Sequence, residues 1–302
     1  MRVIKPSDIS LVSSTIPEDE YALYDAAATY NTGDRVIVAY ESDGITDRTP
    51  HEIYESTADL NTGNYPPDSA TVWTLISATN RWKMFDSFIN TKTESDVDFT
   101  VVLNSGLTDN VALLEVEANS VDLIFKDDTG TILKSETINL DVSDTPDYWE
   151  YFFNPFIYKR NVIWEYPKYY TSTLEITFYT ANGAANCGMV VTGVKYEIGV
   201  TQYTPSIGID DYSKKETDDW GRTYLDQGEY AKLNTYDVWI DNIDIDYVFN
   251  ILTGLRATPC VYQGNNTTSY EALIVYGFYK TFSIDIPGPV KSRISFDIEG
   301  LI

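Results

Sequence analysis

Hydrophobic and polar residues alternate in many short stretches in the middle of the chain. Leu174, Ile176 and Phe178, for example, alternate with the polar residues Glu175 and Thr177. Successive side chains of a β-strand point to opposite faces, so this period of two indicates strands with one buried face. Comparable runs follow at 99–103, 111–116, 121–126, 131–133 and 189–198, with turn-forming residues between them. The spacing predicts an antiparallel β-sandwich, jelly roll-like, over residues 81–204.

The C-terminal part, residues 205–302, contains further strand patterns and one pattern of a different period. Ile245, Val248, Phe249 and Leu252 recur at the spacing of one helix face, directly after a capping sequence at 241–244. We therefore expect the only substantial helix at about 244–255, after a polar stretch at 210–224. Strands are expected at 236–240, 260–262, 272–279, 282–286 and 294–298. These patterns predict a β-rich domain with one short helix.

The first eighty residues divide into a polar segment and a small module. Residues 1–20 hold a short strand pattern at Val3-Ile4 and then an acidic, Ser/Thr-rich stretch, so an arm and linker are expected. Residues 21–80 predict a small sheet with a polar loop at 41–50. Its strands are expected at 36–40, 52–56 and 71–76. Residues 81–86 predict a strand that fixes this module to the next domain. The chain as a whole is expected to be mainly β.

The net charge of the chain limits the classes of molecule that it is expected to bind. The 302 residues include 21 Lys and Arg against 46 Asp and Glu, a net charge of −25. Nucleic acids and anionic membranes attract clusters of basic residues, so we expect no nucleic-acid partner and no membrane insertion. No run approaches the roughly 20 apolar residues of a membrane span. The first residues also lack the apolar segment of a signal peptide, so synthesis in a cytoplasm is expected.

Few residues fit a catalytic or metal centre. His51 is the only histidine, and its position after a Thr-Pro pair predicts a solvated loop residue. Cys187 and Cys260 are far apart and lack the spacing of a zinc site, so we expect two buried thiols. The aspartates within 241–246 fit helix capping better than a calcium loop. We therefore expect no enzyme activity, no metal and no cofactor.

A dense aromatic run occupies residues 148–158 and is followed by Trp164, Tyr166, Tyr169 and Tyr170. Basic residues interleave with it, as they do where aromatic rings stack on bases. The acidic character of the chain argues against that use. A sandwich strand combined with a protein interface is the preferred interpretation, because Tyr and Trp are enriched in interfaces.

The module of residues 21–80 carries an ordered set of positions, namely Tyr24, Tyr30, Gly33, Asp34, Val36, Tyr54, Gly63, Pro66 and Trp73. In order and spacing, this set resembles the chitin-binding carbohydrate-binding modules of families 5 and 12. The resemblance implies that Tyr24 and Tyr65 stack on sugar rings, while Asp59, Asn61 and Asn64 supply hydrogen bonds. Those modules usually expose tryptophans after the second strand, whereas residues 56–65 contain only one aromatic residue, Tyr65. The alternative is that the aromatic residues form the core of a small fold.

The C-terminal unit, with Trp220-Gly221-Arg222, the segment 276–280 and the ending 296–301, resembles bacteriophage tail or virion structural proteins in overall pattern. The central region is similar in general form to galactose-binding-like jelly rolls. The phage resemblance implies a non-enzymatic, oligomeric virion component of the tail, baseplate or fibre-attachment region, assembled in the cytoplasm of a host bacterium. Its partners would be other tail and baseplate proteins, further copies of itself and a host surface glycan. Two alternatives stay open: a secreted polysaccharide-binding protein or accessory module of a polysaccharide-degrading enzyme, and a module with a purely structural role.

Overall fold

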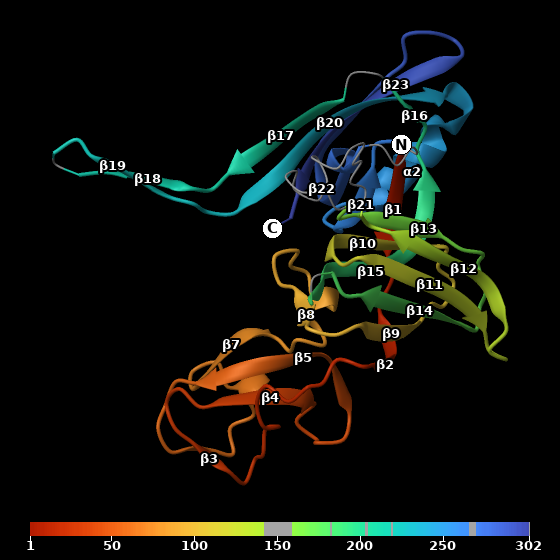
Figure 1. Cartoon of the computed structure of the whole chain (residues 1–302). Coiled ribbons are helices and arrows are strands. Elements are labelled where there is room, and N and C mark those ends of the chain that lie inside the picture. The colour runs from red at the N-terminus through yellow and green to blue at the C-terminus, as the bar shows by residue number, and fades with distance from the viewer. Residues whose placement is uncertain (142–158, 182, 203–204, 219, 266–269, 302) are drawn as a thin grey trace, which may run out of the picture.

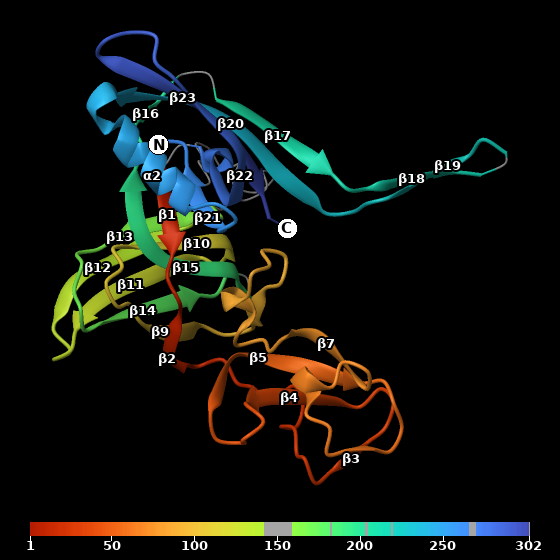
Figure 2. The same ribbon diagram turned by 180° about the vertical axis from the view of Figure 1, so that it is seen from behind.

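A computed structural model describes residues 1–141, 159–181, 183–202, 205–218, 220–265 and 270–301 of the chain (Figure 1; Figure 2). Strands account for 55% of the structure and helices for 8%, which confirms the predicted mainly β class. The described residues contain one α-helix, α2 (Ile245–Gly254), within the predicted span 244–255. Short 3-10 helices are η1 (Pro66–Asp68), η2 (Lys83–Phe85), η3 (Asn242–Asp244) and η4 (Glu271–Leu273).

Two sheets pack face to face in the middle of the molecule. One has five strands in the order β12-β11-β14-β9-β2, and the opposing layer is formed by β13, β10 and β15. Leu174, Ile176 and Phe178, which predict a strand by their alternation, are buried between the two layers. The region is therefore a β-sandwich. The bounds are β2 (Ser10–Ser14), β9 (Phe99–Asn104), β10 (Asn110–Glu117), β11 (Ser120–Asp127), β12 (Ile132–Asn139), β13 (Val162–Glu165), β14 (Ser172–Tyr179) and β15 (Ala185–Glu197).

The second layer of the sandwich continues into the C-terminal unit as one sheet of eleven strands, so the two predicted domains share a sheet. The order along it is β13-β10-β15-β1-β21-β22-β23-β20-β16, with β8 paired to β15 and β17 to β20. The remaining bounds are β1 (Arg2–Pro6), β8 (Thr93–Ser95), β16 (Val200–Thr201), β17 (Ser206–Asp211), β20 (Tyr230–Asp241), β21 (Cys260–Gln263), β22 (Ile274–Asp285) and β23 (Lys291–Gly300). The segments predicted as two strands, at 272–279 and 282–286, form the single strand β22, with an irregularity between Tyr279 and Thr281.

The prediction that residues 1–20 form an arm and a linker is wrong for most of that segment. β1 pairs with β15 on one side and with β21 on the other, in the middle of the large sheet. Val3 and Ile4 are both buried, because neighbouring layers cover both faces of the strand. β2 then pairs with β9 in the other sheet. The first strand of the chain thus joins the sandwich to the C-terminal unit.

Helix α2 covers one face of the C-terminal part of the large sheet. Val248 and Leu252 lie in a buried cluster with Tyr236 of β20 and Phe296 of β23. Asp244 occupies the N-cap position, but its side chain makes no capping hydrogen bond. The helix is therefore stabilised by its apolar face rather than by the carboxylate that the sequence suggests.

The N-terminal module is a small separate unit beside the sandwich (Figure 1). It holds a three-stranded sheet, β4 (Arg35–Tyr40), β5 (Asp47–Ser56) and β7 (Trp73–Ala78), and a two-stranded one, β3 (Thr29–Tyr30) and β6 (Asn61–Thr62). Strand β5 includes the end of the loop predicted at 41–50. Residues 81–86 form turns and the short helix η2 instead of the predicted strand, and Trp82 and Met84 are buried there.

A long hairpin leaves the large sheet and projects from the body of the molecule (Figure 1; Figure 2). Its base is β17 against β20, and its outer part is β18 (Lys214–Thr217) against β19 (Thr223–Asp226). Every residue of β17, β18 and β19 is exposed. The outer part, residues 214–226, is named the arm tip below. It lies mostly within the segment that the sequence predicts only as a polar stretch, 210–224.

The aromatic run 148–158, predicted to form a strand and a protein interface, lies outside the described residues. Of the aromatic residues after it, Trp164 in β13 and Tyr166 are buried in the sandwich. Tyr169 and Tyr170 are exposed.

Candidate functional site

The aromatic residues of the module gather around the buried Trp73. Its ring centroid lies 5.2 Å from that of Tyr30 and 6.1 Å from that of Tyr24. Tyr24 also contacts Tyr65, with 6.0 Å between the ring centroids and 68° between the planes. Edge-to-face contacts of this kind are typical of aromatic cores. The structure therefore brings the two proposed sugar-stacking residues together, with their rings against other aromatic rings.

The two asparagines of the predicted glycan site are hydrogen-bonded within the module. Asn61 is buried, and its Nδ2 donates to Oγ of Ser56 at 3.1 Å. Asn64 donates from Nδ2 to Oδ1 of Asn61 at 2.7 Å, and its backbone oxygen accepts from Nε1 of Trp73 at 2.9 Å. These bonds connect β6 to β7 and hold the aromatic cluster in place.

Asp59 precedes β6 in the chain and contacts the turn before β4. Its Oδ1 accepts a hydrogen bond from the backbone N–H of Thr32 at 3.0 Å, and this bond holds the pKa of Asp59 below its usual value. The hydroxyl of Tyr65 donates to the backbone oxygen of Tyr40 at 2.7 Å. The five residues predicted to bind a glycan thus divide into two contacting tyrosines, two linked asparagines and one separate aspartate.

A polar cluster fixes the module to the segment that precedes it. Glu18 accepts hydrogen bonds from Thr79 at 2.7 Å and pairs with Arg81 at 2.8 Å. His51 Nδ1 lies 2.9 Å from the same carboxylate. Burial opposes ionisation of Glu18, but the hydrogen bonds from His51 and Thr79 and the nearby charges outweigh it and lower its pKa. The sequence prediction for His51 is wrong, because the residue lies in β5, is half-buried and has a partner.

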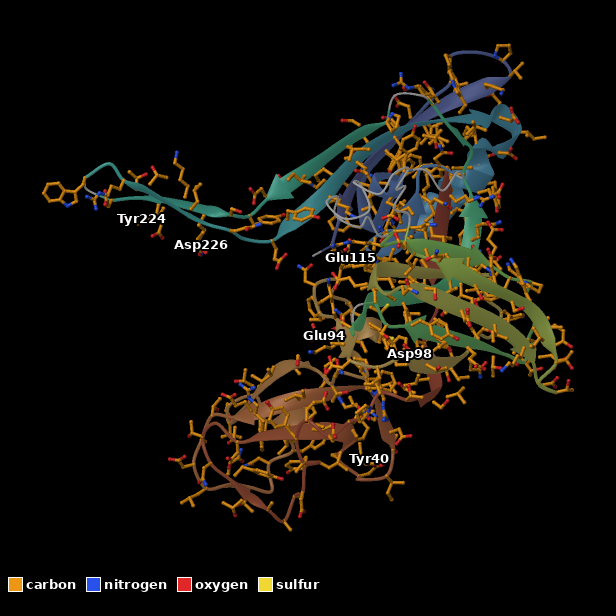
Figure 3. All side chains as sticks on the ribbon, in the orientation of Figure 1. Tyr40, Glu94, Asp98, Glu115, Tyr224 and Asp226 are labelled. Atoms are coloured by element: carbon orange, nitrogen blue, oxygen red, sulfur yellow. The ribbon has the colours of Figure 1, made fainter. Side chains whose placement is uncertain are left out.

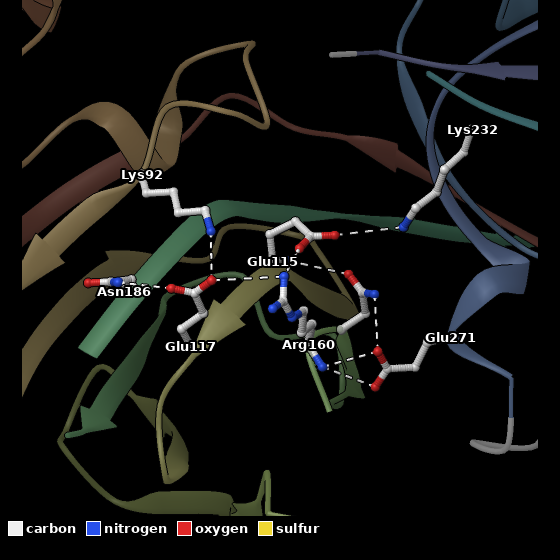
Figure 4. Close-up of polar contacts among 8 residues, drawn as sticks. Lys92, Glu115, Glu117, Arg160, Asn186, Lys232 and Glu271 are labelled. Atoms are coloured by element: carbon white, nitrogen blue, oxygen red, sulfur yellow. Dashed lines mark hydrogen bonds and ion pairs between the residues drawn. The ribbon is translucent and has the colours of Figure 1, made fainter. Parts of the chain in front are cut away.

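A second polar cluster joins the base of the hairpin to the sandwich (Figure 4). Glu115 of β10 lies 3.4 Å from Arg160 and 3.7 Å from Lys232 of β20. Glu117 pairs with Lys92 at 2.8 Å, and the hydrogen bond from Lys92 is the largest cause that lowers the pKa of Glu117. Every carboxylate and cation named here has a partner of opposite charge, which fits a structural joint.

Beside this cluster lies a hollow of about 220 Å³, with Leu114, Tyr276 and Leu301 among its lining residues. Glu115 has a left-handed backbone, with φ of 49°. Non-glycine residues seldom adopt this conformation, and it costs free energy. A Cβ on Gly188 would lie 3.0 Å from Cβ of Glu115, so a larger residue at this position of β15 would force a small shift of its neighbours. The packing around Glu115 and Gly188 therefore limits which residues fit at these two positions.

The arm tip has a different character, because the described residues of its strands are exposed and its basic side chains have no ion-pair partner among the described residues. Trp220 at the turn is 89% exposed and Leu225 is 78% exposed. The side chains of Lys214, Lys215 and Arg222 form no ion pair with any residue that the structure describes. Figure 3 shows Tyr224 and Asp226 far out on the hairpin. The arm tip thus presents apolar and charged side chains together on an exposed surface that another molecule can contact.

The side chain of Asp218 makes hydrogen bonds to described residues at the end of the arm tip. Oδ1 of Asp218 accepts from the backbone N–H groups of Trp220 at 3.0 Å and of Arg222 at 2.7 Å. Gly221 adopts φ of +78°. An Asp followed by a Gly in a left-handed conformation is a turn signal, and this signal identifies the hairpin that the sequence analysis misses.

No group of three or more His, Cys, Asp or Glu residues among those described is arranged to hold a metal ion. Within the same residues, no helix has the length and apolar character needed to span a membrane. Comparison with protein-family models finds no match, and a search of curated proteins finds none either.

Proposed function

We propose that the chain is a non-enzymatic structural subunit of a bacteriophage tail, baseplate or fibre-attachment region, and that it joins its neighbours through the projecting hairpin. The observation that carries this proposal is the arm tip. It leaves the body as a two-stranded ribbon, with every residue of β18 and β19 exposed. Its partners are other tail proteins and further copies of the same chain, within the virion.

Physical chemistry supports a role in assembly for such a ribbon. An isolated two-stranded hairpin is at best marginally stable in water, because it buries little apolar surface. Ordering each residue costs roughly 1–2 kcal/mol of backbone entropy, so a ribbon gains stability when a partner covers it. Exposed unpaired strand edges and a large exposed aromatic residue such as Trp220 are suited to that contact.

In this proposal the module of residues 21–80 is a rigid docking element, displayed on the outside of the particle. The polar cluster around Glu18 holds it to the body. All five predicted glycan-site residues have side-chain contacts or hydrogen bonds within the module itself. In this proposal the module therefore positions the chain in the particle and does not convert a substrate.

Two experiments test the proposed function. Mass spectrometry of purified virions from the source phage should detect the chain at a fixed copy number per tail. Deletion of its gene should leave particles whose tails are incomplete in electron micrographs. Intact, infective tails that lack the chain would overturn the proposal.

A second candidate function, binding of a polysaccharide, is favoured by one observation: Tyr24 and Tyr65 lie in contact on the same module. A glycan array with the intact chain tests it, together with a hydrolysis assay on chitin. Retention of chito-oligosaccharides that is lost in Tyr65→Ala, with the module still folded, would favour this function over a purely structural module.

A further inference from the structure

Strand β2 is the border strand of the five-stranded sheet, and one of its two edges has no strand partner. It pairs with β9 on one side, and the sheet ends with β2 on the other. The backbone of Ser10–Ser14 makes no hydrogen bond with any described residue outside β9. An unpaired edge presents N–H and C=O groups that can pair with another extended segment. β2 is therefore a template for the addition of a strand.

This border strand lines a groove between the sandwich and the module. All five residues of β2 line a hollow of about 360 Å³, together with Asp47, Thr49 and His51 of β5. A second hollow of about 330 Å³ shares the lining residues Ile9, Thr49 and Trp82 with the first. These two adjoining hollows are named the junction groove. Figure 1 and Figure 2 show β2 at the border of the sandwich that faces the module.

Trp82, which lines both hollows, carries a buried polar group without a partner. The residue is 5% exposed, and its Nε1 makes no hydrogen bond with any described residue. The ring packs against His51, at 5.1 Å between ring centroids, and against Phe85, at 5.9 Å. A buried indole N–H usually has an acceptor, because leaving it unpaired costs free energy. A backbone carbonyl of a segment in the groove would supply that acceptor.

The unpaired charges of the junction groove are negative. The carboxylates of Asp8 and Asp47 form no ion pair with any residue that the structure describes. Arg81, the one Lys or Arg residue among the described lining, is already paired with Glu18 at 2.8 Å. A segment with Lys or Arg side chains therefore complements the groove, whereas an acidic segment would be repelled.

We propose that the junction groove binds an extended basic segment of a neighbouring protein, which adds to β2 as a further strand of its sheet. Backbone hydrogen bonds to β2 would give the affinity, and Lys or Arg side chains of the segment would pair with Asp8 and Asp47. β2 has five residues, so at roughly 3.3 Å per residue its edge accommodates a segment of about five residues. The inference deepens the proposed function and rests on it for one point, that the neighbour is another tail protein.

The size of the contact sets the expected strength. A segment of about five residues gives an interface below about 1,200 Å², the range of weak and transient contacts. Tethering inside one particle raises the effective concentration of the segment, so the same contact is stronger between assembled subunits than with a free peptide. Opposite charges across the contact make the binding sensitive to salt. We therefore expect weak, salt-sensitive binding of a free basic peptide.

Fluorescence anisotropy of the purified full chain with a dye-labelled peptide tests the inference. The probe is Lys-Val-Lys-Val-Lys with blocked ends, which the parent should bind. The acidic peptide Glu-Val-Glu-Val-Glu should bind at least about tenfold more weakly. N-methylation of every backbone nitrogen of the basic peptide removes its donors and keeps its charge, so it should weaken binding by about tenfold or more. This last peptide separates strand addition from simple attraction of charges.

Variants of the chain assign the binding to the groove. Asp8→Asn with Asp47→Asn should weaken binding of the basic peptide by about tenfold. Asp128→Asn with Asp226→Asn makes the same change of charge at two exposed positions outside the groove, and should bind as the parent does. Trp82→Phe removes the indole N–H but keeps a ring, and should weaken binding by about threefold or more. Circular dichroism should show that each variant keeps the parental fold.

Three results would overturn the inference: no binding by the parent, equal binding of the N-methylated peptide, or unchanged binding by the variant of Asp8 and Asp47. Self-association of the chain that the basic peptide competes away would also overturn it, because the occupant would then be a second copy. A chain that is present in tails but does not bind the peptide leaves the proposed function standing. Peptide binding by a chain that is absent from virions removes that function and keeps the groove as a site for a basic segment.

Discussion

Nδ1 of His51 lies 2.9 Å from Oε1 of Glu18, so the only histidine of the chain is bound to a carboxylate 33 positions earlier. The same carboxylate pairs with Arg81, whose Nε donates to the backbone oxygen of Ile16 at 2.8 Å. The two sequence ends of the module are thereby joined at one point. This cluster ties both ends of the module to one half-buried carboxylate.

The first prediction concerns the pH dependence of this joint. The pKa of Glu18 is lowered from the usual 4.5, so the folded state favours the ionised carboxylate. A lowered folded pKa contributes stability that is present above 4.5 and is lost as the pH falls through the folded value. Glu18→Gln should cost about 1–3 kcal/mol at neutral pH, and the difference from the parent should shrink in acid. Thermal unfolding from neutral pH down to about pH 3 measures this.

The control for this experiment is Asp19→Asn, since Asp19 is exposed and next in the chain. This variant should follow the parent at every pH. A stability difference for Glu18→Gln that stays constant down to pH 3 would show that the carboxylate charge does not hold the module.

The second prediction concerns the backbone of Glu115, with its φ of 49°. Glycine adopts this conformation without the steric cost that a side chain adds, so Glu115→Gly relieves strain that Glu115→Ala retains. Both variants remove the ion pairs to Arg160 and Lys232. The glycine variant should therefore be more stable than the alanine variant by about 1 kcal/mol, measured by urea unfolding. Equal stabilities would mean that the conformation carries no strain.

Local patterns predict those strands whose two faces have different surroundings. β14 is identified by alternation, because one face lies in the sandwich core and the other does not. The short strand pattern at Val3-Ile4 is confirmed by β1, but its place in the middle of the large sheet is not predicted, because the two buried residues face different layers and the partners β15 and β21 are distant in sequence. The hairpin is missed for the opposite reason. Its strands β18 and β19 have no buried face, so they carry no hydrophobic period.

The candidate sites are less predictable than the strands, because a residue pattern does not say which way a ring faces. Trp73, Tyr24 and Tyr65 occur at the same spacing whether they stack on a sugar or on each other. The contact between His51 and Glu18 forms only when the module folds against the segment that precedes it. A local sequence pattern does not predict such a contact. A turn signal at Asp218 and Gly221 is present, and it identifies the arm once it is sought.

The third prediction tests the two thiols, which the structure confirms as free and buried. Burial raises the pKa of Cys260 to about 12 and that of Cys187 well above its usual range, so neither is a thiolate at neutral pH. The native chain should not react with a thiol reagent such as DTNB over minutes, while the denatured chain should release two equivalents. Rapid reaction of one thiol in the native state would contradict the burial shown here.

The fourth prediction separates a structural Asn61 from a sugar-binding one. Its Nδ2 donates to Ser56 and to the backbone oxygen of Val72 inside the module. Asn61→Ala should therefore destabilise the module by about 1–3 kcal/mol, because it leaves buried polar groups without partners. Limited proteolysis at about neutral pH and thermal unfolding measure the loss. Asp59→Ala, at an exposed position, is the comparison and should cost less; equal effects would argue against the internal role of Asn61.

The last prediction compares two tryptophans in opposite environments. Trp73 is 2% exposed at the centre of the module, and Trp220 is 89% exposed at the end of the hairpin. Trp73→Ala leaves a cavity among Tyr24, Tyr30 and Val36 and should cost about 3–5 kcal/mol. Trp220→Ala should change the stability of the monomer by no more than about 0.5 kcal/mol. Calorimetry at concentrations where the chain is monomeric measures both values. A large loss for Trp220→Ala under those conditions would mean that the arm tip packs against its own chain, and the assembly role assigned to it would fail.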